Sequence, residues 1–262
     1  MTYKCYSICG PGLVRAENQD NLYVNGTYRQ DVSADSVFRH ETISYNNGLY
    51  AVADGMGGEK HGELASLIAV KALKDGTLSD GEMAIYVTII NDAICDLMNE
   101  KGGARIGSTF AGLRVDGSNA EILNIGDSRI YLFRGGKLTQ LSIDHTETQQ
   151  MIDLGLIDKA AVRKHHDRHV LTQHLGIFPS EFIIEPHTAH FDLQTGDIFL
   201  LCSDGLTDML DDPAIEEILN NPGSVTSLAE SLYNAALQNG GKDNITILLL
   251  GIEKDATESE NT

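Results

Sequence analysis

The chain has 262 residues, long enough for one large domain or two small ones, and its 42% apolar residues can fill a sizeable core. Its 38 acidic and 19 basic side chains give a formal net charge of −19. A surface this acidic repels phosphate backbones, so we expect no binding to nucleic acid. The N-terminus lacks a signal-peptide pattern, and the longest apolar run, 245–252, is too short to cross a bilayer. We therefore expect a soluble cytoplasmic protein without a membrane segment.

The four cysteines are scattered and form no CxxC pair. Cys5 and Cys9 fall on one face of a predicted strand, but no two further zinc ligands stand near them. Intracellular disulfides are rare. We therefore expect buried free thiols in a reducing compartment.

The first half of the chain predicts strands followed by two helices. Residues 3–9, 22–24 and 49–53 are apolar runs typical of strands, and 25–48 lacks periodicity and predicts a long loop or irregular hairpin. Apolar residues recur at helical spacing in two later segments, 63–74 and 80–99. Both apolar stripes are expected to pack into the core.

The second half predicts mostly strands joined by tight turns, with a polar, helical segment at 144–176 between them. The predicted strands are 109–115, 120–125, 129–133, 137–141, 182–190, 197–202 and 245–251, and helices are expected near 212–219 and 225–238. No repeat or linker divides the chain, so this order predicts one α+β layered domain over 1–252. The acidic tail, 253–262, is expected to be disordered.

One local pattern occurs twice. An apolar run ends at Asp54-Gly55, and another, 199–203, ends at Asp204-Gly205. A single Asp-Gly pair is most often only a turn signal. Two such pairs at the ends of predicted strands indicate two carboxylates that converge on one point.

Further carboxylates stand beside Gly or Asn next to predicted strands. The complete set is Asp20, Asp54, Asp127, Asp204 and Asp243. Any one of them can be an N-cap or turn residue. Together at one sheet edge they would repel strongly unless cations lay among them. Because oxygen ligands favour hard ions, we expect Mg²⁺ or Mn²⁺ instead of Zn²⁺.

Two such ions about 4 Å apart can share a water and lower its pKa, which gives a nucleophile for in-line attack on phosphorus. Arg15, five residues before Asp20, has a guanidinium fork that matches phosphoryl oxygens. The alternative is a surface arginine paired with Glu17.

Several motifs occur together in a fixed order. They are Arg15-x-x-Asn18-Gln19-Asp20, Asp54-Gly55-Met56-Gly57-Gly58, Gly107-Ser108-Thr109, Gly126-Asp127-Ser128-Arg129, Asp144-His145-Thr146, Leu171-Thr172-x-x-Leu175-Gly176, Ser203-Asp204-Gly205-Leu206 and Asp243-Asn244. In this order the chain resembles the bacterial branch of the metal-dependent (PPM or type 2C) serine/threonine protein phosphatases, over roughly residues 5–252. The resemblance implies a four-layer αββα sandwich, with two central antiparallel sheets flanked by helices and the metals at one end.

The resemblance also implies roles for individual residues. Asp54 would bridge two metals, Asp204 and Asp243 would complete the first, and Asp20 with the Gly55 carbonyl would serve the second.

Asp127, together with Asp204, would match a weaker third metal site, so that the cofactor would be two to three Mn²⁺ or Mg²⁺ ions per chain. Arg15 matches the arginine that contacts substrate phosphate, and with Asp54 it is expected to be catalytic. Residues 144–170 fall where the family carries its flap, a mobile segment beside the active site.

The chain departs from the family pattern at the proposed proton donor. Met56 stands where many eukaryotic members have His, and Glu59 stands where many bacterial members have it, the nearest histidine being His61. A metal-bound water could take that role instead. Gln173-His174 replaces Arg-Ala in another element. The histidines of 145–174 fit no closed zinc set by spacing and are expected to be surface or flap residues.

We therefore predict a phosphoprotein phosphatase that hydrolyses phosphoserine and phosphothreonine, acts as a monomer and opposes a bacterial Ser/Thr kinase. One alternative is a pseudophosphatase, a metal-binding interaction module without turnover, which the altered proton-donor positions would favour. A second is an acidic cation-binding domain, which would leave Arg15 and Gly126-Asp127-Ser128-Arg129 unexplained.

Overall fold

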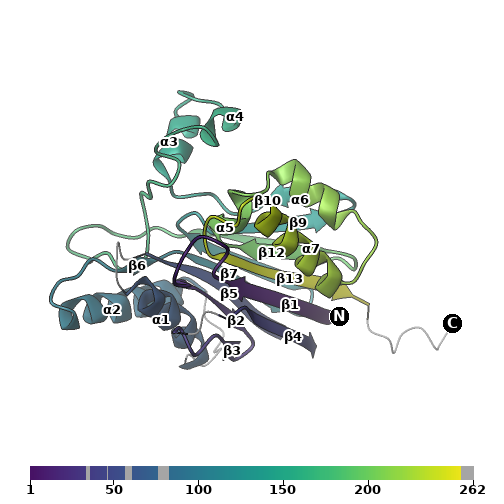
Figure 1. The fold of residues 1–262 in the computed structure, drawn as a ribbon. Helices are drawn as coiled ribbons and strands as arrows, with labels where there is room; N and C mark the ends of the chain where they lie inside the picture. The colour runs from purple at the N-terminus through teal and green to yellow at the C-terminus, as the bar shows by residue number, and fades with distance from the viewer. Residues whose placement is uncertain (34–35, 46, 57–60, 76–82, 255–262) are drawn as a thin grey trace.

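A computed structural model describes residues 1–33, 36–45, 47–56, 61–75 and 83–254. Its strands form two antiparallel sheets stacked face to face (Figure 1). In sheet order, the strands of the first are β10 (Lys137–Gln140), β9 (Arg129–Arg134), β12 (Ile198–Cys202), β13 (Ile245–Glu253), β1 (Thr2–Gly10) and β4 (Phe38–Tyr45). Those of the second are β11 (His187–Asp192), β8 (Asn119–Ile125), β7 (Phe110–Asp116), β5 (Asn47–Met56), β2 (Asp20–Val24) and β3 (Thr27–Tyr28), with β6 (Gly107–Ser108) paired to β5.

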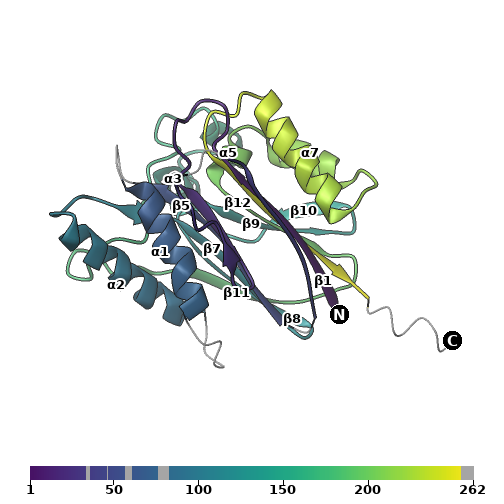
Figure 2. The ribbon, with the colours of Figure 1, turned by 60° about the horizontal axis from the view of Figure 1, so that its bottom comes forward.

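Helices cover the outer face of each sheet (Figure 2). Helices α1 (Gly62–Asp75) and α2 (Ala84–Glu100) pack on the second sheet, and α6 (Asp212–Leu219) and α7 (Val225–Gln238) pack on the first. A third apolar cluster fills the space between the sheets and includes Tyr3, Tyr50 and Phe199. The central strands are therefore covered on both faces, which explains their long apolar runs. The predicted αββα sandwich is confirmed.

Most predicted elements lie where they were expected, and the differences have physical reasons. The predicted loop 25–48 contains β3 and the long strand β4. Because β4 is an edge strand, its exposure alternates along a largely polar sequence, which hid it from an apolar-run search. Glu253, predicted to begin the tail, instead ends β13, where it pairs with Thr2. The rest of the predicted tail, from 255 on, lies outside the described residues.

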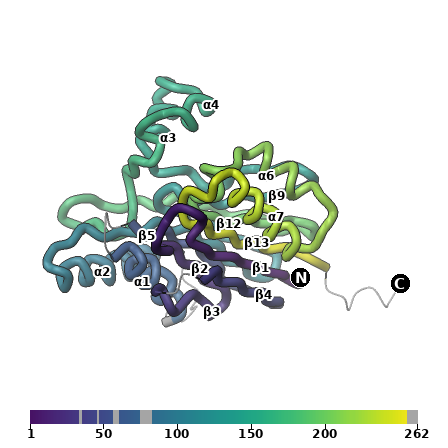
Figure 3. The backbone as a smooth tube through the Cα atoms, viewed as in Figure 1, coloured from purple at the N-terminus to yellow at the C-terminus, as the bar shows by residue number. Residues whose placement is uncertain are grey.

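The 144–170 segment projects from the sandwich and carries two short helices (Figure 3). They are α3 (Glu147–Asp153), capped by Thr146, and α4 (Lys159–Val162), capped by Asp158. Backbone hydrogen bonds from Glu147 to Val170 and from Thr172 to His145 join the two ends of the segment at its base. Its assignment as a flap stays a prediction.

Two further expectations concern the whole chain. All four cysteines are buried free thiols, as predicted. Within the described residues, no helix is long and apolar enough to cross a membrane.

Candidate metal centre

Two of the predicted carboxylates come from neighbouring strands of the second sheet. Asp20 begins β2, Asp54 lies near the end of β5, and the strand register places them directly opposite each other. Opposed residues of an antiparallel pair have Cα atoms within about 6 Å. The two carboxylates are therefore neighbours at this end of the sheet.

The other three carboxylates reach the same end from the first sheet. Asp204 begins the short helix α5 (Asp204–Thr207) directly after β12, and Asp243 lies two residues before β13, the neighbour of β12. Asp127 lies in the connection from β8 to β9, where the chain passes between the sheets. Asp54, Asp127, Asp204 and Asp243 line one cavity of about 630 Å³. The convergence expected from the repeated Asp-Gly pattern is present.

Asp20 lies behind this cavity and joins the two sheets. Its Oδ2 accepts hydrogen bonds from Ser203 Oγ and Thr246 Oγ1, each at 2.7 Å. Ser203 directly follows β12 and Thr246 lies in β13, and both of these strands belong to the first sheet. Its side chain is fully buried, yet Oδ1 has no hydrogen-bond partner among the described residues. A buried carboxylate oxygen without a donor is suited to act as a ligand of a cation.

The glycine after each paired aspartate is required by close backbone contacts. A Cβ on Gly55 would lie 2.0 Å from the Gly62 carbonyl oxygen, and a Cβ on Gly205 would lie 1.9 Å from the Asn244 carbonyl oxygen. No side chain fits at either distance. The Asp-Gly repeat thus marks two places where the backbone of another segment crosses directly behind a carboxylate.

The motif Gly107-Ser108-Thr109 fixes the main chain of Asp54. The Asp54 amide donates to Thr109 Oγ1 at 3.0 Å, and the Asp54 carbonyl accepts from the Thr109 amide at 2.9 Å. Thr109 Oγ1 also lies 2.7 Å from Ser128 Oγ, next to Asp127. The hydroxyls therefore couple the positions of two carboxylates that line the cavity.

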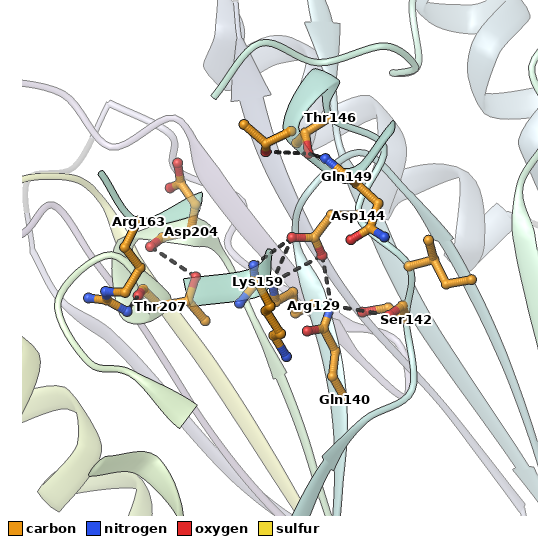
Figure 4. A network of polar contacts seen from close by, with 12 residues as sticks. Arg129, Gln140, Ser142, Asp144, Thr146, Gln149, Lys159, Arg163, Asp204 and Thr207 are labelled. Carbon is orange, nitrogen blue, oxygen red and sulfur yellow. Dashed lines mark hydrogen bonds and ion pairs between the residues drawn. The ribbon is translucent and has the colours of Figure 1, made fainter. Parts of the chain in front are cut away.

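A second network supports the loop that carries Asp127, and Figure 4 shows the part of it around Arg129 and Asp144. Arg129 Nε and Nη2 donate to both oxygens of Asp144 at 2.6–3.0 Å, in a largely buried bidentate pair. The Gly126 amide donates to His145 Nδ1 at 3.1 Å, and burial lowers the pKa of His145, which favours this acceptor role. Asp144 and His145, which sequence analysis left without a role, thus hold both sides of the Asp127 loop.

The carboxylates lie so close together that ionising all of them is unfavourable unless cations offset their charge. Burial and the charges of Asp204 and Asp243 raise the pKa of Asp20 from 3.8 to about 7, against the lowering effect of its two hydroxyl donors. Burial and the charge of Asp20 raise the pKa of Asp54 well above its usual value, and burial and Asp204 do so for Asp127. Such a set, with one oxygen unpaired, fits divalent cations.

Arg15 faces the cavity instead of forming a surface pair with Glu17. Its Nη2 lies 2.6 Å from Asp243 Oδ2, and the side chain is 58% exposed at the rim. The Asn244 side chain holds this loop in place, because its Nδ2 donates to Glu17 O at 2.8 Å and its Oδ1 accepts from Gln19 N at 2.8 Å. A guanidinium is therefore presented beside the carboxylates.

The histidines only partly match the expectation that they are surface or flap residues. His169 does belong to the 144–170 segment and is 41% exposed, but its ring lies against Asp204 and Asp208. Hydrogen bonds to these two carboxylates raise its pKa to about 10. His174 also lines the cavity. No spacing in the sequence signals the His169 contact, since its partners are more than thirty residues away.

The positions predicted to supply a proton donor are only partly described. Met56 lines the cavity, whereas His61 is not among the lining residues and its Nδ1 lies 4.0 Å from Glu63. Glu59 lies outside the described residues. The nitrogen-bearing titratable side chains that the structure places on the cavity wall are Arg15, His169 and His174.

Comparison with known proteins agrees with this geometry. The family model for protein phosphatase 2C matches residues 19–246. The serine/threonine phosphatase stp of Listeria monocytogenes is 32% identical over 258 residues, covering 94% of each chain. The crystal structure of the serine/threonine phosphatase PstP of Mycobacterium tuberculosis superposes with a TM-score of 0.80 at 31% identity, covering 97% of this chain and 100% of that one. A structure of the PstP catalytic domain with two manganese ions gives a TM-score of 0.77 at 30% identity, covering 97% of this chain and 100% of that one. The chain therefore belongs to the protein phosphatase 2C family, within the bacterial PPM-type serine/threonine phosphatases.

Proposed function

We propose that this chain is a metal-dependent phosphoprotein phosphatase that hydrolyses phosphoserine and phosphothreonine. The observation that carries the proposal is the convergence of carboxylates from both sheets on one polar cavity with an arginine at its rim. The proposed metal ligands are Asp20, Asp54, Asp127, Asp204, Asp243 and the Gly55 carbonyl.

Asp54 has the central position among these ligands. Asp20 lies directly opposite it in the sheet, and the three other carboxylates line the same cavity as Asp54. Burial raises the pKa of Asp54, and the charges of these four carboxylates raise it further. With its two oxygens at the centre of such a set, Asp54 would help to hold the cations. Asp204 and Asp243 flank it from one sheet and Asp20 from the other. Manganese in the PstP structure supports Mn²⁺ as one suitable ion, with Mg²⁺ the alternative.

Cations bound in this cluster would neutralise phosphoryl oxygens and supply a water of lowered pKa as the nucleophile. The protein's own contribution is positional. Thr109 and Asn244 fix the backbone on either side of the cluster, and Arg15 supplies the donors that orient two phosphoryl oxygens. Because Arg15 is half exposed, it can meet a phosphate that enters from solvent.

The pseudophosphatase alternative is not favoured. Every carboxylate of the predicted set is present, and the structure brings all of them to one end of the sandwich. The acidic cation-binding domain without a phosphate role would leave the placement of Arg15 without a purpose. We further propose that the substrates are cytoplasmic phosphoproteins of a Ser/Thr kinase and that the chain acts as a monomer. The named activities of its relatives support the substrate class.

The test is phosphate release from a phosphothreonine peptide with Mn²⁺, with Mg²⁺ and with EDTA. Asp54→Asn should lose metal-dependent release while retaining the circular dichroism spectrum of the folded protein. Asp116→Asn, at an exposed hairpin end of β7, is the matched control and should keep full activity. An Asp54→Asn protein with unchanged turnover would refute the proposed mechanism.

A further inference from the structure

His169 lies at the wall between two cavities, together with two of the cavity carboxylates. Asp127, His169 and Asp204 each present a ligand atom, and these three atoms all lie within 4.8 Å of one another. His169 Nδ1 is 3.5 Å from Asp204 Oδ2. Three donor atoms this close together can bind a single cation, and one of them is an imidazole nitrogen.

The opposite side of the His169 ring is held by a third carboxylate. Nε2 lies 3.2 Å from Asp208 Oδ2, and Asp208 Oδ2 in turn lies 3.4 Å from Arg168 Nη2. A metal-binding histidine almost always donates its second ring N–H to a carboxylate, which fixes the tautomer and the ring orientation. Asp208 therefore directs Nδ1 toward Asp127 and Asp204.

Both sides of this arrangement, the aspartates Asp204 and Asp208 and the histidine His169, are held by backbone hydrogen bonds. Asp204 and Asp208 stand four residues apart, joined by a backbone hydrogen bond from the Asp208 amide to the Asp204 carbonyl at 2.8 Å. His169 precedes Val170, whose carbonyl accepts the Glu147 amide at the base of the 144–170 segment. Arg163 attaches the same segment to α5 by donating to the carbonyls of Thr207 and Asp208. The approach of His169 to Asp204 is thus a feature of how the segment is attached.

We propose that His169 Nδ1 is a ligand of a divalent cation held between Asp127 and Asp204, with Asp208 orienting the imidazole. The inference rests on the proposed function, because Asp127 and Asp204 are both among the proposed metal ligands. What it adds is His169 as a ligand at the third site that the resemblance implies for these two aspartates. Because imidazole suits Zn²⁺ and other late transition ions whereas Mg²⁺ prefers oxygen, this position selects Zn²⁺ or Co²⁺ over Mg²⁺. The cation then ties the 144–170 segment to the metal centre.

A direct test is nuclear magnetic resonance of the full chain with ¹⁵N-labelled histidine and ¹¹³Cd²⁺. We expect a ¹¹³Cd–¹⁵N scalar coupling at His169 Nδ1, lost in His169→Gln and in Asp127→Asn. His174 lines the same cavity, so His174→Gln is the matched control and should keep the coupling. A wild-type spectrum with cadmium bound but no coupling to His169 would overturn the proposal.

Calorimetric titration with Zn²⁺ and with Mg²⁺ gives an independent readout. Asp208→Asn should weaken Zn²⁺ binding at this position by about 10- to 100-fold, the usual effect of removing such an orienting carboxylate, and His169→Gln by at least as much. Mg²⁺ binding should change less. If His169 only forms ion pairs with Asp204 and Asp208, His169→Gln will leave Zn²⁺ affinity unchanged or raise it, which refutes ligation. Neither readout depends on turnover, so failure here is distinguishable from failure of the phosphatase proposal.

Discussion

Replacing Asp20 with Asn should stabilise the metal-free protein at alkaline pH and yet reduce the stabilisation that cations provide. The wild-type carboxylate is fully buried, and burial together with neighbouring negative charges raises its pKa from 3.8 to about 7. The folded protein therefore binds a proton here more tightly than the unfolded chain does. Stability is lost as pH rises from about 4 to about 7, because ionisation is free in the unfolded chain and opposed in the folded one.

The magnitude follows from the size of the shift. A change of about three pKa units, at about 1.4 kcal/mol each, destabilises the folded metal-free protein by about 4 kcal/mol at pH 8. Asparagine carries no charge, and its carbonyl can still accept from Ser203 and Thr246. Its amide group, however, would replace the oxygen that already lacks a partner, at a cost of about 1–3 kcal/mol. The net gain is about 1–3 kcal/mol at pH 8.

The assay is urea unfolding of both proteins in EDTA at pH 5 and pH 8, repeated with excess Mn²⁺. In EDTA, the unfolding free energy of Asp20→Asn relative to wild type should be about 3 kcal/mol larger at pH 8 than at pH 5. The reason is that ionisation of Asp20 costs the folded wild type the equivalent of about two pKa units over this pH range. With Mn²⁺ the order should reverse, because ligand binding to the folded state stabilises the wild type more. An equal effect of the substitution at both pH values in EDTA would show that Asp20 ionisation is not what strains the metal-free fold.

Three further predictions concern the rim, the backbone and the support of the site. Arg15→Ala should lower kcat/KM for a phosphothreonine peptide by about 10- to 100-fold, because it removes a charge-assisted bidentate contact worth about 1.5–3 kcal/mol. An unchanged kcat/KM would show that Arg15 does not bind the phosphate. Gly205→Ala forces a Cβ to 1.9 Å from a backbone oxygen, so we expect thermal denaturation at least 10 °C below wild type, and a native melting point would contradict the contact. Arg129→Met leaves Asp144 with Gln140 as its remaining side-chain donor and no opposite charge. The substitution should destabilise the protein by about 3–5 kcal/mol in urea, and a loss below about 1 kcal/mol would mean that solvent screens this pair.

Local sequence patterns predicted those features of the site that depend on neighbouring residues in the chain. The Asp54-Gly55 and Asp204-Gly205 pairs were recognisable because each follows an apolar strand and because glycine is sterically required where another backbone crosses. The layered fold was predictable for a similar reason, since alternating apolar runs and helical stripes reflect which faces are buried. Strand β4 was missed because its edge position relaxes that requirement.

The remaining features of the site depend on contacts between distant segments. Arg15 meets Asp243 across 228 positions, and the choice between this pair and Glu17 depends on Asn244 fixing the loop. The position of His169 depends on how Arg163 attaches its segment to α5. Neither contact follows from residue spacing, because spacing describes one element at a time.

At the metal centre, the clustered carboxylates destabilise the metal-free fold and are explained by the function they serve. Five segments converge there. The buried guanidinium of Arg29 donates to the backbone carbonyl of Asp20, and hydroxyl donors satisfy only one of the two carboxylate oxygens of Asp20. A neutral side chain would relieve that strain, so the carboxylate is best explained by what it binds. The side chains of Thr109 and Asn244 bond to backbone atoms and so do not occupy the aspartate oxygens. The fold therefore holds the carboxylates in place against their mutual repulsion, and cations convert that repulsion into binding energy.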